Sequence, residues 1–213
     1  MRAVVIIPTY NEADNIQRFL TQVRSDAPNT DILIVDDNSP DGTSQIAKEV
    51  ADRLGQIKVM TRTANRGYAA ASRDAMRAAI SDNYDVIATM DADFSHDPAV
   101  LEKLVAQVNE NTAVVIGSRY VAGGQVTNWP LFRRLLSRWG NLYTAFCLNL
   151  KIKDCTSGFR AYSAKHLAQI NLAELTADGY AFLTEMAFVI SRNNLGDVVE
   201  VPINYVDRAF GDS

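Results

Sequence analysis

Two aspartates separated by one alanine, Asp91 and Asp93, are the residues whose type and spacing most directly indicate chemistry. They follow an apolar run, residues 86–90, that has the length of a strand. Because residues i and i+2 of a strand point the same way, both carboxylates project together. A divalent cation between them and a ligand would keep both ionised, and hard oxygen ligands favour Mg2+ or Mn2+. The alternative is a solvated acidic turn after a strand.

A second candidate is a window that is rich in basic residues and free of acidic ones. The chain has a formal net charge of −4, yet residues 111–153 contain no Asp or Glu and six basic residues: Arg119, Arg133, Arg134, Arg138, Lys151 and Lys153. Such a window suggests a surface for a phosphate group or an anionic membrane. The alternative is chance clustering on a solvated helix face.

Alternating strand and helix patterns supply the elements that would position these residues. Apolar runs of strand length recur at residues 3–7, 31–37, 57–60, 86–90 and 113–116. Apolar residues at helical spacing lie between them, and Pro98 is placed to start a helix with Asp97 as its N-cap. This alternation predicts βαβ units and a mostly parallel sheet.

Polar residues follow three of the predicted strands, at residues 9–12, 36–37 and 91–93. Open parallel sheets bind ligands at the carboxyl ends of their strands, so this convergence favours a nucleotide site. Neither a GxGxxG nor a GxxxxGK[ST] motif occurs, which excludes the dinucleotide and P-loop fingerprints. The phosphates must therefore be held by a metal ion and side chains.

Length and composition predict one soluble globular domain. The 213 residues are 47% hydrophobic and 22% charged, without a repeat or a low-complexity tract. No apolar run is long enough to span a bilayer, and a strand begins directly after Arg2, without a signal peptide. The two cysteines have neither metal-ligand nor redox spacing. We expect a cytoplasmic location.

Several motifs occur in an order that resembles a known family: VVIIPTYNE, ILIVDDNSPDGT, MDADFSHDP, GSRYVAGG, DCTSGFRAY, GYAFLTEM and the closing EVPINYVDRAFGDS. They resemble the inverting family-2 glycosyltransferases of the GT-A fold, and more narrowly the polyprenol (dolichyl) phosphate mannose synthases. The resemblance covers nearly the whole chain. It implies a single-domain, Rossmann-like α/β fold in which residues 1–118 form a nucleotide-binding half and residues 119–213 an acceptor-binding half.

The resemblance also implies which residues bind the substrates. The nucleotide sugar is assigned to Pro8, Tyr10, Glu12, Val35, Asp37, Asp91, Ala92, Asp93 and Arg208. The acceptor phosphate is assigned to Arg119, Arg133 and Ser137, and the catalytic set to Asp91, Asp93, Arg119, Arg133 and Arg208. Tyr10 could instead cap the sheet edge, and Arg134 or Arg138 could replace Arg133.

The metal site implied by the resemblance comprises Asp91 and Asp93, with Ser95 as a third candidate ligand. Some family members carry a Gln or another metal contact at the position of Ser95, so the third protein ligand stays open. The implied cofactor is Mg2+ or Mn2+, which would stabilise charge on the departing diphosphate.

The implied reaction transfers mannose from GDP-mannose to a polyprenyl phosphate. The second pKa of a phosphate monoester is about 6, so this nucleophile is anionic at neutral pH and needs no general base. It needs positioning, which planar guanidinium groups provide. Attack from the side opposite the diphosphate would invert the anomeric configuration.

Three further polar residues have less certain roles. Glu185 either orients the acceptor-site arginines or forms a structural ion pair. Asp154 and Ser157, which flank Thr156, are expected to shape the cleft beside the sugar.

Residues 129–146 alternate aromatic and aliphatic side chains with arginines at helical spacing. This pattern predicts a basic amphipathic helix of the interfacial kind. The alternative is a helix that packs its apolar side on the sheet. The expected partners are GDP-mannose, a polyprenyl (dolichyl) phosphate and the cytoplasmic face of a membrane, where the protein would be peripheral. A membrane-anchoring subunit is a further candidate, whereas nucleic acid is not expected.

Two alternative functions stay open from the sequence. One is a related transferase that uses UDP-glucose or another sugar nucleotide, or a saccharide hydroxyl as acceptor. The other is a sugar-nucleotide-binding subunit without turnover, against which the presence of both aspartates and all candidate arginines argues.

Overall fold

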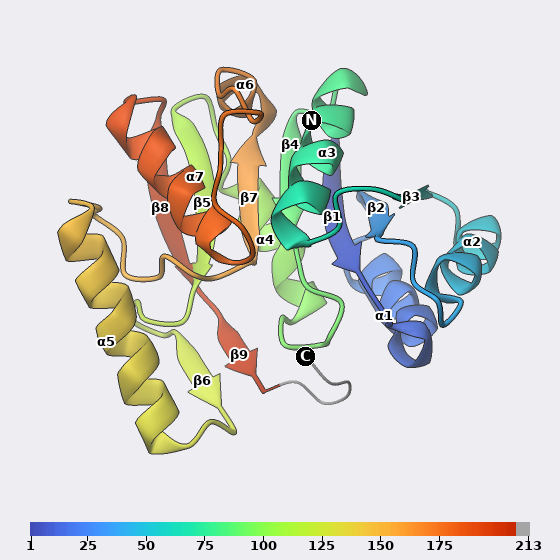
Figure 1. Ribbon diagram of the computed structural model, residues 1–213, viewed down its shortest axis with the longest axis horizontal. Coiled ribbons are helices and arrows are strands. Elements are labelled where there is room, and N and C mark those ends of the chain that lie inside the picture. The colour runs from blue at the N-terminus through green and yellow to red at the C-terminus, as the bar shows by residue number, and fades with distance from the viewer. Residues whose placement is uncertain (208–213) are drawn as a thin grey trace.

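One seven-stranded sheet carries the fold, in the order β3-β2-β1-β4-β7-β5-β8 (Figure 1). The computed structural model describes residues 1–207. Its sheet strands are β1 (Ala3–Thr9), β2 (Thr30–Asp36), β3 (Ile57–Thr61), β4 (Val86–Thr89), β5 (Thr112–Ser118), β7 (Arg160–Ser163) and β8 (Asp197–Pro202). Only β7 is antiparallel to its neighbours, β4 and β5. The predicted mostly parallel sheet is confirmed.

Helices cover both faces of this sheet. One face is packed by α1 (Ala13–Asp26), α2 (Thr43–Leu54), the 3-10 helix η1 (Pro98–Val100) and α4 (Leu101–Ala106), the other by α3 (Tyr68–Ser81), α6 (Ala164–Leu167) and α7 (Ala181–Arg192). Alternate residues of β1 divide between the two layers: Val5 and Ile7 join the first, Val4 and Ile6 the second. Burial on both faces explains why the strands read as unbroken apolar runs.

Some element boundaries differ from the prediction. The expected helix from Pro98 begins as η1, where the Asp97 carboxylate accepts a 3.0 Å hydrogen bond from the Ala99 N–H, and α4 ends at Ala106. The Asp97 N-cap is thus confirmed. In α2, Val50 is buried, whereas Leu54, the last residue of the helix, is 37% exposed.

The turns at the carboxyl ends of β1, β2 and β4 contain left-handed residues. Asn11 and Asn38 have φ of 58° and 56°, a conformation that Asn tolerates well. Phe94, directly after Asp93, has φ of 60°, which is uncommon for a bulky residue. Its ring packs edge-on against Phe19 with centroids 5.2 Å apart. This packing holds the acidic turn in a strained conformation, as is typical of functional loops.

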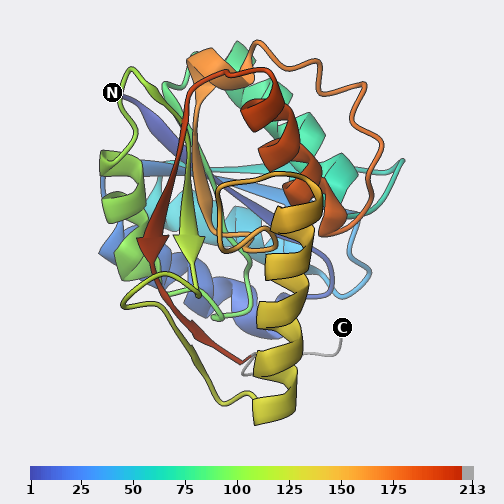
Figure 2. The same ribbon diagram turned by 90° about the vertical axis from the view of Figure 1, so that its left-hand side faces the viewer.

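The helix α5 (Leu131–Cys147) lies apart from the two helical layers, beside the parallel pair β6 (Gln125–Thr127) and β9 (Asn204–Val206) (Figures 1 and 2). Only Asn141 and Ala145 of this helix are buried. The alternative in which its apolar side packs on the sheet is therefore wrong. Among residues 1–207, no helix has the length and apolar content required to span a membrane.

Candidate active site

Two adjoining cavities open at the sheet edge where β1, β2 and β4 end. The β2-side cavity has a volume of about 420 Å³, and the α5-side cavity a volume of about 570 Å³. Asp91 and Tyr180 line both. The pair of acids after β4 therefore lies where the two cavities meet.

The β2-side cavity collects most of the residues predicted to bind the nucleotide sugar. The predicted residues that line it are Pro8, Tyr10, Glu12, Val35, Asp37, Asp91 and Ala92. Tyr10 is half exposed, and the Arg66 guanidinium lies 5.9 Å from the centre of its ring. An exposed aromatic ring at the mouth of a cavity can stack on a planar base.

Protein groups bind both carboxylate oxygens of Asp37. Its Oδ2 accepts a 2.6 Å hydrogen bond from the Gly67 N–H, and its Oδ1 forms a buried ion pair with Arg62. Arg62 also binds Asp74 at 2.9 Å and donates to the Asn65 carbonyl at 2.8 Å. This network fixes the loop between β3 and α3 as a wall of the β2-side cavity. No local sequence signal marks Arg62 as the partner of Asp37.

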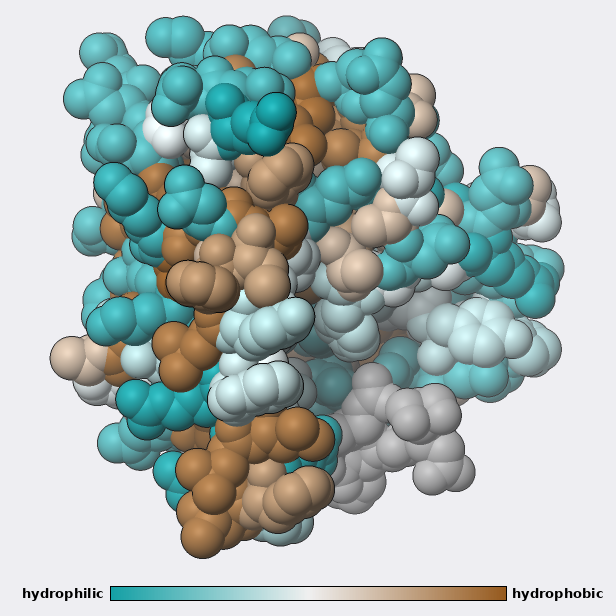
Figure 3. Space-filling model, turned by 60° about the vertical axis from the view of Figure 1, so that its left-hand side comes forward, coloured by the Kyte–Doolittle hydropathy of each residue, from teal (hydrophilic) through white to brown (hydrophobic). Residues whose placement is uncertain are grey.

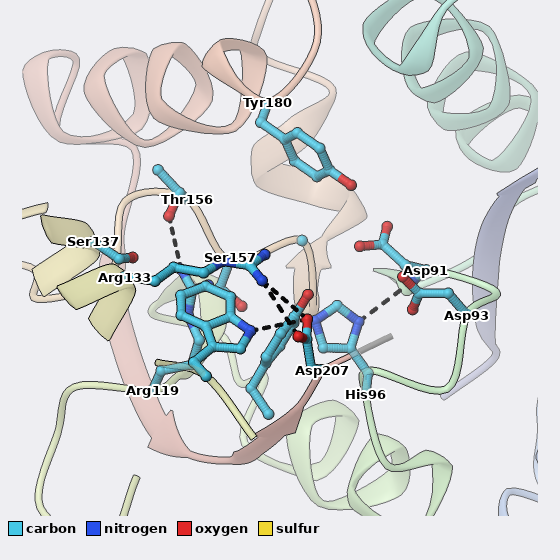
Figure 4. A pocket seen from close by; sticks show the side chains of 13 residues that line it. Asp91, Asp93, His96, Arg119, Arg133, Ser137, Thr156, Ser157, Tyr180 and Asp207 are labelled. Atoms are coloured by element: carbon cyan, nitrogen blue, oxygen red, sulfur yellow. Dashed lines mark hydrogen bonds and ion pairs between the residues drawn. The ribbon is translucent and has the colours of Figure 1, made fainter. Parts of the chain in front are cut away.

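The α5-side cavity separates the acidic pair from two arginines, one of which, Arg133, is paired with a third lining acid, Asp207. In Figure 4, Asp91 and Asp93 lie on one side, and Arg119 and Arg133 on the other. Ser137, the third predicted acceptor-phosphate residue, also lines this cavity. The structure thus brings together the predicted metal pair and the predicted phosphate-binding groups, although β4 and α5 are far apart in the sequence.

Ser95 lies behind the acidic pair. It is fully buried, does not line either cavity, and its backbone N–H donates a 3.0 Å hydrogen bond to Asp93 Oδ1. Gly158, two residues before β7, lies close to Asp91 and Tyr68: a Cβ at this position would lie 3.2 Å from the Tyr68 hydroxyl and 3.4 Å from both carboxylate oxygens of Asp91. A larger residue at this position would require the Tyr68 hydroxyl to shift by a few tenths of an ångström.

Arg119 is held by a buried ion pair with Asp154. Its Nε and Nη2 donate to the two oxygens of that carboxylate at 2.8 and 2.7 Å, and Nη2 also donates to Thr156 at 2.7 Å. Burial raises the pKa of Asp154, but the hydrogen bonds and charge of Arg119 outweigh it and hold this pKa below its ordinary value. The guanidinium is thereby fixed at the cavity wall, with its Nη1 unpaired among residues 1–207.

Arg133 is more accessible than Arg119. Its Nη1 lies 3.2 Å from Asp207 Oδ1, and its guanidinium lies 4.0 Å from the centre of the Trp129 ring. Ser137, one turn later, accepts a 2.6 Å hydrogen bond from the Tyr120 hydroxyl. Arg134 and Arg138, the sequence alternatives to Arg133, line a different cavity on the other flank of α5. The geometry therefore favours Arg133.

Three further residues line the α5-side cavity: His96, Ser157 and Tyr180. The sequence predicts no role for His96 or Tyr180 and only a general one for Ser157. His96 is buried with its ring stacked on Phe159, and burial lowers its pKa to about 4. Its Nδ1 accepts a 3.4 Å hydrogen bond from the Asp91 N–H. The Ser157 hydroxyl is buried and, within residues 1–207, has no hydrogen-bond partner. Tyr180 stacks on Tyr68 at 5.0 Å. His96 lies in the SHDP motif and Ser157 in the TSGFR motif, but the spacing of these motifs does not predict that either residue lines a cavity.

Within residues 1–207, Glu185 forms no ion pair and bonds a loop instead of an arginine, so neither of its two expected roles is seen there. Its carboxylate oxygens accept hydrogen bonds from the backbone N–H groups of Thr176 and Ala177, at 3.1 and 3.0 Å. It does not line either cavity, so it orients a loop instead of an arginine. Arg208, predicted to face the diphosphate, lies outside the described residues.

The acidic pair fits a divalent cation of the predicted kind. Among the described residues no group of three His, Cys, Asp or Glu side chains is arranged to hold a metal. Mg2+ does not need such a cage, because it is commonly bound through one or two carboxylates together with substrate phosphates and water. Asp91 and Asp93, both lining the α5-side cavity, supply that donor set.

Two named proteins are similar to this chain over its whole length. The chain is 41% identical to an undecaprenyl-phosphate mannosyltransferase of Micrococcus luteus, covering all of this chain and 87% of that protein. It is also 41% identical to a polyprenol monophosphomannose synthase of Mycolicibacterium smegmatis, covering all of this chain and 80% of that protein.

A solved structure shows the same fold at low sequence identity. It is the mannosyltransferase PcManGT from Pyrobaculum calidifontis in complex with GDP-Man and Mn2+, with a TM-score of 0.67 and 18% identity over all of this chain and 58% of that one. The likeness confirms the predicted GT-A fold. Residues 4–170 match the family described as glycosyl transferase family 2. The chain belongs to glycosyltransferase family 2.

Proposed function

We propose that this protein transfers mannose from GDP-mannose to a polyprenyl phosphate, with inversion at the anomeric carbon. The observation that carries the proposal is the α5-side cavity, where two carboxylates face two arginines across a space of about 570 Å³. Relatives with 41% identity over the whole chain are named for mannosyl transfer to undecaprenyl or polyprenol phosphates. The PcManGT structure, solved with GDP-Man and Mn2+, supports the donor and the metal.

The donor would lie across both cavities. The base and ribose would occupy the β2-side cavity beside Tyr10 and Asp37, and the diphosphate would reach Asp91 and Asp93. These two acids would hold Mg2+ or Mn2+, which supplies charge neutralisation for the departing diphosphate. Apart from Tyr180, the described residues that line the β2-side cavity fall between Pro8 and Ala92, which supports a nucleotide-binding half at residues 1–118.

The acceptor phosphate would enter from the α5 side. Arg133 presents an accessible guanidinium there, and Ser137 presents a hydroxyl. Arg119 presents its Nη1, which takes no part in the ion pair with Asp154. Since the phosphate is already anionic, these groups need only to aim one oxygen at the sugar. The exposed apolar side of α5 supports a peripheral position at a membrane, where the acceptor's polyprenyl chain resides.

The test is transfer of labelled mannose from GDP-mannose to a short polyprenyl phosphate in detergent. We expect a mannosylated lipid phosphate of inverted anomeric configuration, and loss of the product when EDTA removes the metal. UDP-glucose and a free saccharide replace donor and acceptor in parallel reactions. Product only with UDP-glucose, or only on the saccharide hydroxyl, would contradict the proposal, and so would full turnover in EDTA.

A further inference from the structure

A third cavity lies on the flank of α5 that faces away from the acidic pair. It has a volume of about 480 Å³, and its basic lining residues include Arg134, Arg138 and Lys153. We call these three residues the basic triad. Arg133 and Ser137 line the α5-side cavity, whereas Arg134 and Arg138, one position later, line this one. One helix thus presents two pairs of polar residues, each spaced by four, to two cavities that share only Arg119 among their described lining residues.

The charges of the basic triad are not compensated by the protein. Within residues 1–207, none of the three side chains forms an ion pair or a hydrogen bond. The nearby carboxylates are already engaged: Asp154 binds Arg119, and Glu200 accepts backbone N–H bonds from Lys153 and Asp154 at 2.9 and 3.0 Å. Three exposed cations around one cavity form a site for an anion with several oxygens.

The third cavity adjoins an exposed apolar surface. Leu131 and Leu135 line the cavity itself, and Phe132, Trp139 and Phe146 are 76, 62 and 85% exposed along the same helix. Figure 3 shows brown, hydrophobic side chains gathered on this face of the molecule, interrupted by paler ones and flanked by hydrophilic residues. An apolar band next to unpaired cations is complementary to lipid tails below a layer of phosphates.

We propose that the basic triad binds the phosphate of an anionic membrane phospholipid, at a site distinct from that of the acceptor. Arg133 and Arg134 are successive residues, so their Cα atoms lie about 1.5 Å apart along the helix axis. An α5 that rests on a bilayer would then meet bulk lipid phosphate on one flank and acceptor phosphate on the other. The proposal does not depend on which sugar is transferred.

Charge argues against a second copy of this chain as the occupant of the α5 face. A two-fold symmetric contact would bring the same surface of each copy together. Residues 111–153 contain no acid, so the two basic triads would approach without a carboxylate from this window to neutralise them.

The experiment is co-sedimentation with vesicles in the absence of sugar nucleotide and of polyprenyl phosphate. One set is phosphatidylcholine alone, and the other an equal mixture with phosphatidylglycerol. We expect wild-type protein to prefer the anionic vesicles, and a variant carrying Arg134→Gln, Arg138→Gln and Lys153→Gln to bind them about a hundredfold more weakly. Lys48→Gln, Arg53→Gln and Lys103→Gln together form the matched control, because they remove the same charge from exposed positions on α2 and α4.

Several outcomes would overturn the proposal. Equal vesicle binding by wild type and the triad variant would do so, as would an equal loss in the matched control. If the triad variant loses binding of inorganic phosphate but keeps vesicle binding, the cavity is a site for soluble anions. A wild-type dimer in sedimentation velocity that Phe132→Ser dissociates would assign the α5 face to a second copy. Mannosyl transfer in detergent, measured on the same triad variant, should be unchanged and separates this proposal from that of the function.

Discussion

At the scale of single residues, the two arginines of the α5-side cavity differ in how they are held. Arg119 is buried and oriented by two hydrogen bonds to Asp154, whereas Arg133 is about half exposed and rests on the Trp129 ring. Burying a charged pair is costly, and removing one partner leaves an uncompensated charge. The pair therefore gives Arg119 a fixed direction, which suits a group that must aim a phosphate.

Breaking this pair should destabilise the protein. Asp154→Asn is expected to lower the free energy of unfolding by about 3 kcal/mol at pH 7, because Arg119 stays buried without its counter-ion. Since the pKa of Asp154 is depressed in the folded state, the pair's contribution is present above the ordinary pKa and is lost as pH falls below about 4. Urea denaturation at several pH values measures both.

Asp82→Asn is the matched control for this prediction. Asp82 forms an exposed pair with Lys58 at 2.7 Å, and surface pairs contribute little to stability. Wild type and Asp154→Asn should differ less in their free energy of unfolding below pH 4 than at pH 7. If this difference stays the same, the ionised carboxylate is not what stabilises the fold.

Arg133 and Arg134 allow a sharp test of acceptor binding, since they are adjacent in sequence and line different cavities. In detergent, Arg133→Gln should raise the KM for a short polyprenyl phosphate about tenfold or more, because a charged hydrogen bond to phosphate is lost. Arg134→Gln should leave that KM unchanged. Initial rates at varied acceptor concentration measure both, and equal effects of the two substitutions would remove Arg133 from the acceptor site.

At the scale of elements, the loop before α7 is positioned by one acid within that helix. Glu185 accepts hydrogen bonds from two successive backbone N–H groups, of Thr176 and Ala177. Tyr180, at the end of the same loop, lines both cavities and stacks on Tyr68. The helix α7 thus helps to shape both cavities, because its Glu185 anchors the loop that ends at Tyr180.

Removing this anchor should affect stability and donor binding together. Glu185→Ala is expected to lower the free energy of unfolding by about 1 to 2 kcal/mol, because two N–H groups lose their acceptor. It should also raise the KM for GDP-mannose, since the loop that carries Tyr180 loses two of its hydrogen bonds. Glu174→Ala is the control: within residues 1–207, the carboxylate of this exposed residue of the same loop bonds only the Asn171 side chain. Thermal unfolding and donor kinetics measure the two effects, and an unchanged KM would separate Glu185 from the site.

At the scale of the whole molecule, donor and metal should bind as one unit where the two cavities meet. GDP with Mn2+, at about a hundred times its Kd, is expected to raise the melting temperature by about 5 to 10 °C. The shift should shrink when EDTA is present and in Asp93→Asn, which lacks one of the two carboxylates. A shift of the same size in Asp93→Asn would contradict the assignment of the metal to this pair.

Much of this architecture is readable from the sequence. Runs such as residues 3–7 are apolar at every position because both faces of the sheet are covered, and the polar residues that follow must meet at one edge of a parallel sheet. That is why Thr9, Tyr10 and Asp91 line one cavity as expected. These inferences rest on local periodicity and on a topological rule, so they need no knowledge of side-chain contacts.

Only the tertiary structure decided which partners the charged residues have and whether the apolar side of α5 is covered or exposed. Asp37 pairs with Arg62, Asp154 with Arg119, and Glu185 with a backbone loop, since hydrogen bonding depends on the docking of distant segments. The helical pattern of residues 131–147 shows an apolar stripe equally well for a covered or an open helix. Its exposure follows from the position of α5 outside both helical layers, where the described chain packs little against it.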